Sequence, residues 1–301
     1  MRTQWASLDD LTDEVRRCAQ ERREFSEVEA LVRKLVILQD RIQTPAVSAV
    51  GREDLEASLR EGGILLEDVA VDPDALRGHL KAVLSLLDDR REHLMPLFDV
   101  LADYFLENLE GMKRELPEDP GKWASRLNEA FGIPEDTAQL LLWAVLHPFF
   151  RSHARALLGD ADTALWSEGF CPVCGARPQF AKLREADGAR IIECWLCATQ
   201  WQFPRIKCPF CSSEDQEMLR FFYLEGDEGL RMQVCDECGR YFKVVDTREM
   251  KREVVLSVQN LATLHCDAVA KSEGYRPGSG LRLVPEMGDE APDTTKRGEN
   301  S

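Results

Sequence analysis

The sequence predicts an α+β protein: an all-α helical N-terminal domain, two tandem metal-binding domains of the rubredoxin-like or zinc-ribbon kind, and a C-terminal helix. Apolar residues recur at helical steps as far as residue 165. Four C-x-x-C pairs then follow within residues 171–238, where the periodicity becomes strand-like. We place the helical domain at 1–165, the two ribbons at 166–206 and 207–250, the C-terminal helix at 251–277 and a disordered tail at 278–301.

Apolar periodicity and helix-boundary residues define the predicted helices. Apolar side chains at three- and four-residue steps predict one helix over Leu11–Gln43, which Thr44-Pro45 ends. Asp72-Pro73 opens another, with Asp72 as N-cap and Pro73 at the first helical position. A long apolar helix runs from Pro134 to Leu158. The first domain therefore reads as helices packed through apolar stripes, without an evident catalytic site.

Eight of the ten cysteines form the four C-x-x-C pairs. Such a turn points two thiolates at one ion, and two turns complete a closed tetrahedral site. Nineteen residues separate the first and second pairs and 23 separate the third and fourth, which is close to the usual spacing of such sites. We predict one ion on the first two pairs and a second ion on the last two: Cys171, Cys174, Cys194 and Cys197; Cys208, Cys211, Cys235 and Cys238.

Other uses of these cysteines are less favoured. A redox C-x-x-C pair should open a helix within a βαβ unit, whereas each pair here lies between short strand-like runs. Disulfides would require export, and no signal segment is found. An interleaved arrangement, with the first pair joined to the fourth, stays open but is less favoured, because residues 198–207 form only a short link.

Each half of the cysteine region has the pattern pair, hairpin, pair. Residues 179–183 and 189–193 alternate like two strands, with Ala186-Asp187-Gly188 as their turn. Residues 218–224 and 230–234 repeat this arrangement, and 241–245 adds a further strand. The pattern predicts two similar ribbons in tandem. A helix over Gln259–Lys271 follows them.

The charge of the chain argues against nucleic-acid binding. The formal net charge is −16. Residues 166–250 hold 11 basic and 14 acidic side chains, and eight thiolates around two divalent ions bring this region to about −7. A phosphate backbone would be repelled. No apolar stretch reaches the length of a membrane span, so we expect a cytoplasmic protein that does not insert into membranes.

The chemistry of the sites favours a structural role for the ions. Four thiolates suit zinc and equally iron, and the sequence leaves both open. A catalytic zinc would need an open coordination position, which four thiolates close. We therefore expect no enzyme activity, and either structural ions or one-electron carriers.

The chain resembles the FdhE family of formate dehydrogenase accessory proteins. The resemblance is strongest from Trp166 to Tyr275 and rests in the N-terminal half on the helix pattern alone. The residues that carry it, besides the eight cysteines, are Trp166, Gly169, Phe170, Pro172, Gly175, Arg190, Trp201, Arg205, Tyr241, Lys243, Asp246, and Ala262-Thr263-Leu264-His265 with Asp267. Cys266 departs from the pattern, where an aliphatic residue is usual.

The resemblance implies a cytoplasmic assembly factor with two rubredoxin-like metal domains. It implies that the partner is the catalytic molybdenum- or tungsten-containing subunit of formate dehydrogenase. It also favours iron as the bound metal more than the cysteine spacing alone does. Homo-oligomers stay possible. As partner-binding residues we consider the seam between helices and ribbons, namely Trp201, Arg205, His265 and Asp267. A rubredoxin-like electron-transfer protein is the alternative, and a zinc-ribbon nucleic-acid binder is disfavoured by charge.

Overall fold

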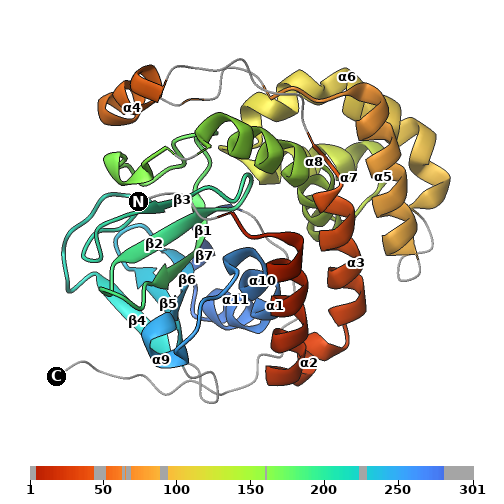
Figure 1. Cartoon of the computed structure of the whole chain (residues 1–301). Coiled ribbons are helices and arrows are strands. Elements are labelled where there is room, and N and C mark those ends of the chain that lie inside the picture. The colour runs from red at the N-terminus through yellow and green to blue at the C-terminus, as the bar shows by residue number, and fades with distance from the viewer. Residues whose placement is uncertain are drawn as a thin grey trace.

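The computed structural model of the chain describes residues 5–43, 52–62, 65, 69–88, 94–159, 161–223 and 229–280. Of the predicted disordered tail, only residues 278–280 fall within these segments, and the rest lies outside the described residues. The helical part and the sheet occupy opposite sides of the molecule (Figure 1). Three helices lie close to the sheet: α1 (Leu8–Glu21), α10 (Leu256–Ala262) and α11 (Leu264–Ser272). No described helix combines the length and the apolar composition needed to cross a bilayer.

The N-terminal part is helical as predicted, and polar residues begin several of its helices. Asp72 accepts a hydrogen bond from the Ala75 amide at the start of α5. Asp119 begins α7 in the same way, through the Lys122 amide. The helices are α1 Leu8–Glu21, α2 Arg23–Ser26, α3 Glu29–Asp40, α4 Arg52–Glu61, α5 Pro73–Asp88, η1 Met95–Leu97, α6 Phe98–Glu115, α7 Pro120–Phe131, α8 Glu135–Leu158 and η2 Thr163–Leu165.

The single helix predicted for Leu11–Gln43 was wrong, because the chain turns back near Arg22. Arg22 is extended, with φ −129° and ψ 115°, and α3 packs against α1. A straight helix of this length would extend for about 50 Å and leave one end without apolar contacts. The hairpin instead lets Val15 and Val36 pack in one cluster with Val258 of α10. No Gly or Pro marks the turn, so the sequence pattern gave no sign of it.

The two predicted ribbons join in one seven-stranded sheet with the order β3-β2-β1-β6-β5-β4, and β7 pairs with β6. Each ribbon contributes an antiparallel hairpin, β1 with β2 and β4 with β5. The junction is the parallel pair β1 and β6, in which Phe180 lies opposite Lys243. The strands are β1 Pro178–Leu183, β2 Arg190–Cys194, β3 Gln200–Gln202, β4 Leu219–Tyr223, β5 Leu230–Cys235, β6 Arg240–Asp246 and β7 Arg276–Pro277.

The C-terminal helical segment consists of two helices instead of one. After the short helix α9, Thr247–Met250, come α10, Leu256–Ala262, and α11, Leu264–Ser272. The break is at Thr263, where φ is −126° and ψ is 32°. Its hydroxyl donates to the Gln259 carbonyl oxygen at 2.7 Å, a local bond that competes with helix continuation. The break lets α10 pack on α1 while α11 contacts β7.

The helical domain and the first ribbon share one hydrophobic core. Trp143 and Phe150 of α8 belong to the same buried cluster as Trp195 and Trp201 of the first ribbon. The second ribbon packs mainly with α11, in a separate cluster around Met232. The predicted domain limits themselves stay predictions, but this packing ties the first ribbon to the helices.

Candidate metal centres

We call each C-x-x-C turn a knuckle. The structure gathers the eight knuckle cysteines into two groups of four: the first two knuckles form one group and the last two form the other. In each group the four sulfur atoms lie within 4.8 Å of one another. This arrangement excludes the interleaved one, in which the first pair would meet the fourth. The groups are cluster 1, Cys171, Cys174, Cys194 and Cys197, and cluster 2, Cys208, Cys211, Cys235 and Cys238.

The sulfur spacing fits a tetrahedral metal site. Bonds of about 2.3 Å from zinc to four thiolates place the sulfurs about 3.8 Å apart. In cluster 1 the Sγ atoms of Cys171 and Cys197 are 3.4 Å apart, and those of Cys174 and Cys194 are 3.5 Å apart. In cluster 2 the contacts from Cys208 to Cys238 and from Cys211 to Cys235 are 3.8 and 3.7 Å. Each cluster can therefore hold one ion with four thiolates.

All four knuckles have the same backbone geometry. The residue after the second cysteine of each pair has a left-handed φ, between 57° and 75°. Its amide donates to the carbonyl oxygen of the first cysteine at 2.8–3.1 Å. Glycine takes this conformation without strain, whereas alanine and serine pay a steric cost that the surrounding fold must offset. These residues are Gly175, Ala198, Ser212 and Gly239.

Backbone amides inside the knuckles face the sulfurs. The amides of Leu196 and Cys197 lie 3.4 and 3.5 Å from Cys194 Sγ, and the Phe210 amide lies 3.4 Å from Cys208 Sγ. Donors in these positions stabilise thiolates over thiols. Burial acts in the opposite direction and raises the pKa of the Cys208 thiol. A bound divalent cation would offset that cost, because metal binding displaces the thiol protons.

The two clusters differ in their access to solvent. Every cysteine of cluster 1 is buried, with at most 5% of its surface exposed. In cluster 2, Cys211 is exposed and Cys238 is half-buried. Cluster 1 is therefore part of the core shared with the helices, and cluster 2 borders the surface.

Helix α8 contacts the second knuckle through two side chains. The Trp143 indole donates to the Trp195 carbonyl oxygen at 3.2 Å, and His147 Nδ1 lies 2.8 Å from the Leu196 carbonyl oxygen. Burial lowers the pKa of His147 to about 3, so its imidazole is neutral. The amides of this knuckle point at sulfur, so its carbonyl groups need hydrogen-bond partners on the side of the loop away from the sulfurs. The helical domain supplies them.

Arg190 connects the two ribbons from inside the fold. Its guanidinium donates to Gln233 Oε1 at 2.7 Å and to the Lys207 carbonyl oxygen at 2.6 Å, and it also contacts the Pro204 carbonyl. The group lies between the rings of Phe203 and Phe242. Burial lowers the pKa of Arg190 to about 9. This arginine thus holds the link between the clusters against the second ribbon.

The four residues considered for partner binding have different environments. Trp201 is fully buried and donates to the Glu168 carbonyl oxygen at 3.0 Å. Asp267 accepts from Tyr241 Oη at 2.8 Å and from Lys243 Nζ at 2.7 Å. Only Arg205 and His265 are exposed. Trp201 and Asp267 therefore have evident structural roles, and the group does not form one exposed surface.

A cleft that the sequence did not indicate lies where the helices meet both ribbons. Its volume is about 800 Å³. Arg177 and Arg240 line it beside the first and fourth knuckles, together with Arg276. Glu118 and Glu135 line the helical side. These residues are distant in sequence and share no motif, so only the tertiary structure brings them together.

Comparison with known proteins identifies relatives of this chain. Residues 170–205 match the family model described as the FdhE central domain. The chain is 30% identical over 179 residues to Protein FdhE of Escherichia coli O1:K1, covering 58% of this chain and 56% of that protein. It is 26% identical over 147 residues to the Protein FdhE homolog of Aquifex aeolicus, covering 48% and 51%. The chain thus spans about half the length of the curated relatives it matches.

A solved structure shares the fold. The crystal structure of the FdhE protein from Pseudomonas aeruginosa superposes with a TM-score of 0.61 at 23% identity. The superposition covers 96% of this chain and all of that one. The arrangement of helices and ribbons described above is therefore one that a solved protein adopts.

Proposed function

Because this chain is similar to FdhE proteins in sequence and in fold, we propose that it is a member of the FdhE family and an accessory protein that assists the maturation of formate dehydrogenase. In this proposal it binds the catalytic molybdenum- or tungsten-containing subunit in the cytoplasm and catalyses no reaction itself. Its eight knuckle cysteines hold two metal ions, iron or zinc, one in each cluster. The finding that supports this role most strongly is the pair of closed four-sulfur clusters in a chain of this family.

The closed clusters favour structural ions over catalytic ones. A catalytic zinc site keeps one position for water or substrate, whereas four thiolates fill the tetrahedron. Cluster 1 is also buried beneath α8, through Trp143 and His147, so a substrate could not approach it. The ions would then fix the shape of the ribbons, which bury little apolar volume of their own.

The second ribbon offers the surface best suited to a partner. Among the described residues, four large hydrophobic side chains are exposed, and three lie in or next to this ribbon: Ile206, Met218 and Tyr223. The fourth is Val100 on α6. Strand β4 is also an edge of the sheet, and among the described residues no strand pairs with its outer side. Exposed apolar residues and a free strand edge are features of protein-binding surfaces.

Co-purification tests the proposal. The tagged full-length chain is expressed in cells that make formate dehydrogenase, and the captured proteins are identified by mass spectrometry. We expect the catalytic subunit in near-stoichiometric amount. The variant Ile206→Glu with Met218→Glu should lose it, whereas the matched control Val100→Glu should retain it, with equal metal content in all three. Absence of the catalytic subunit from the wild-type sample would contradict the proposal.

Electron transfer is a second candidate, and the exposure of Cys211 favours it. An iron ion in cluster 2 would lie near the surface, where a redox partner can approach, as in a rubredoxin. A reversible one-electron couple that disappears in Cys211→Ser and is needed to reduce a partner would support this role. A protein purified with zinc in both clusters would exclude it, since zinc has no redox chemistry.

A further inference from the structure

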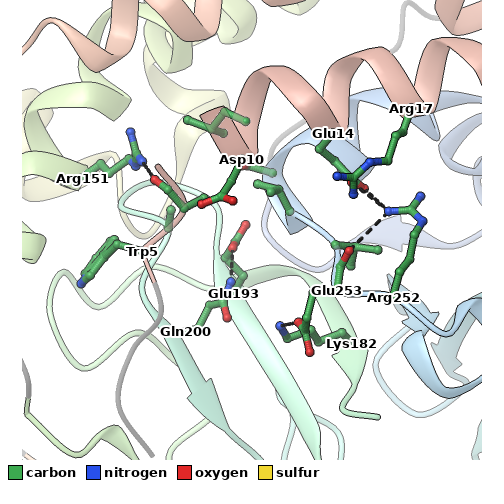
Figure 2. A pocket seen from close by; sticks show the side chains of 16 residues that line it. Trp5, Asp10, Glu14, Arg17, Arg151, Lys182, Glu193, Gln200, Arg252 and Glu253 are labelled. Atoms are coloured by element: carbon green, nitrogen blue, oxygen red, sulfur yellow. Dashed lines mark hydrogen bonds and ion pairs between the residues drawn. The ribbon is translucent and has the colours of Figure 1, made fainter. Parts of the chain in front are cut away.

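A second cavity lies between α1 and the face of β1, β2 and β3, and two of its lining residues, Glu193 and Ala198, are next in sequence to cysteines of cluster 1. Its volume is about 410 Å³, and the segment 252–257 closes one side. Figure 2 shows the Glu193 carboxyl group pointing from the sheet into this pocket, with Gln200 beside it. Asp10 of α1 lines the opposite side, and Trp5 lies at one end (Figure 2).

Glu193 differs from the other buried acids of the chain. Three carboxyl side chains are buried among the described residues: Glu14, Glu193 and Asp246. Glu14 is paired with Arg252 at 2.8 Å, and Asp246 with Arg248 at 2.6 Å. Glu193 is 2% exposed. Its Oε2 atom accepts one hydrogen bond, from the neutral Gln200 amide at 2.8 Å. Its Oε1 atom accepts no hydrogen bond from the residues that the structure describes.

The cations that line the pocket are bound elsewhere. Lys182 donates to Glu253 at 2.6 Å. Arg252 and Arg17 both pair with Glu14, at 2.8 and 3.5 Å. Arg151 donates to the Ala6 carbonyl oxygen at 2.7 Å and lies 3.6 Å from Asp40. No cation in the described chain is therefore within ion-pair distance of Glu193, although several surround the pocket.

We propose that this pocket binds a guanidinium or primary ammonium group, which donates hydrogen bonds to Glu193 Oε1. A buried carboxyl with an unused acceptor costs free energy, and a charge-assisted hydrogen bond from a cation removes that cost. The cavity is large enough for an arginine or lysine side chain, or for a free amine of similar size. This proposal does not depend on the identity of the protein's partner.

Titration calorimetry of the full-length, metal-loaded chain tests the proposal at low ionic strength. Two probes distinguish the sources of the cation: agmatine, a free guanidinium, and a blocked tripeptide with a central arginine. We expect saturable binding of at least one probe. Binding of the tripeptide alone would indicate a polypeptide ligand, and binding of agmatine alone a free metabolite. Acetate, the anion control, should not bind. If neither cation binds, the proposal is overturned.

Variants locate the binding. Glu193→Gln keeps the shape of the side chain but cannot become negatively charged beside a bound cation, so the Kd should rise about tenfold or more. Glu107→Gln removes the same charge from the exposed face of α6 and should leave the Kd unchanged. Because Glu193 precedes Cys194, metal content is measured on each sample, and Ser257→Phe provides an independent test by filling the pocket. Unchanged affinity in both Glu193→Gln and Ser257→Phe would overturn the proposal.

Discussion

His147 Nδ1, on helix α8, lies 2.8 Å from the carbonyl oxygen of Leu196, inside the second cysteine knuckle. Since the amides of that knuckle point at Cys194 Sγ, the imidazole completes the hydrogen bonding of the loop from the side away from the sulfurs. The helical domain thereby contributes to the environment of cluster 1. This polar contact adds to the apolar packing that joins the first ribbon to the helices.

The buried imidazole should make stability depend on pH. The unfolded histidine has a pKa of about 6.5, whereas burial lowers the pKa of folded His147 to about 3. The unfolded chain therefore takes up the proton first as pH falls, and stability is lost below about pH 6.5. At pH 5 the loss is about 2 kcal/mol. Denaturant unfolding at pH 7 and pH 5 should show a smaller loss for His147→Gln than for wild type.

Trp143, which contacts the same knuckle and does not titrate, supplies the control for that measurement. Trp143→Phe removes the hydrogen bond to the Trp195 carbonyl oxygen without changing a titratable group, so it should keep the wild-type difference between pH 7 and pH 5. Equal pH dependence in wild type and His147→Gln would show that the imidazole is not held neutral by burial.

The two clusters should respond differently to loss of one ligand. Cys194→Ser removes a sulfur from the fully buried cluster 1 and should lose one ion and much of the stability of the whole chain. Cys211→Ser should lose one ion from cluster 2 with a smaller drop in melting temperature, because Cys211 is at the surface. Elemental analysis and thermal unfolding of both variants check this. A variant that kept two ions would refute the ligand assignment.

The sequence predicted the grouping of the cysteines better than the relation between the ribbons. Knuckle pairing and the two hairpins follow from local patterns, and the structure agrees with both. The parallel pairing of β1 with β6 joins residues about 60 positions apart. The alternation of side chains within each strand does not indicate that these two strands pair with each other. Strand β3 was missed because it has only three residues, Gln200–Gln202.

One residue considered for partner binding has a contact within the fold that the sequence did not predict. Asp267 was considered for partner binding, yet it pairs with the buried Lys243, which is 1% exposed. Lys243 is on strand β6 and Asp267 is on helix α11, so only the folded chain reveals the pair. The large cleft is lined by Arg177, Arg240 and Arg276. The sequence did not single out these arginines as site residues, because no spacing links them.

Breaking the Lys243–Asp267 pair should destabilise the second ribbon. Asp267→Asn leaves a buried ammonium without its carboxylate, and such changes cost about 3–5 kcal/mol. The double variant Lys243→Met with Asp267→Leu should recover part of the loss, because no charge is left unpaired. Asp13→Asn, in an exposed pair with Arg16, should cost less than about 1 kcal/mol. A stable Asp267→Asn single variant, measured by denaturant unfolding, would contradict this.

A close backbone contact joins the start of the first ribbon to the third knuckle. A Cβ atom on Gly169 would lie 2.1 Å from the Pro209 carbonyl oxygen. Gly169→Ala should displace the knuckle of Cys208 and weaken metal binding in cluster 2, with little effect on cluster 1. Gly78→Ala, in α5 with open space around it, should leave metal binding unchanged and gain up to about 1 kcal/mol. Competition with a chromogenic chelator measures both; equal metal affinity in the two variants would oppose the expected displacement.

The most direct test of the two-site assignment is native mass spectrometry of the full-length chain purified under reducing conditions. We expect a folded species carrying two metal ions and no disulfide, and a shift to the charge states of an unfolded chain once a strong chelator has removed both ions. A compact chain that carries no metal, or one that stays compact and still captures its partner after complete chelation, would contradict the role assigned to the cysteine clusters.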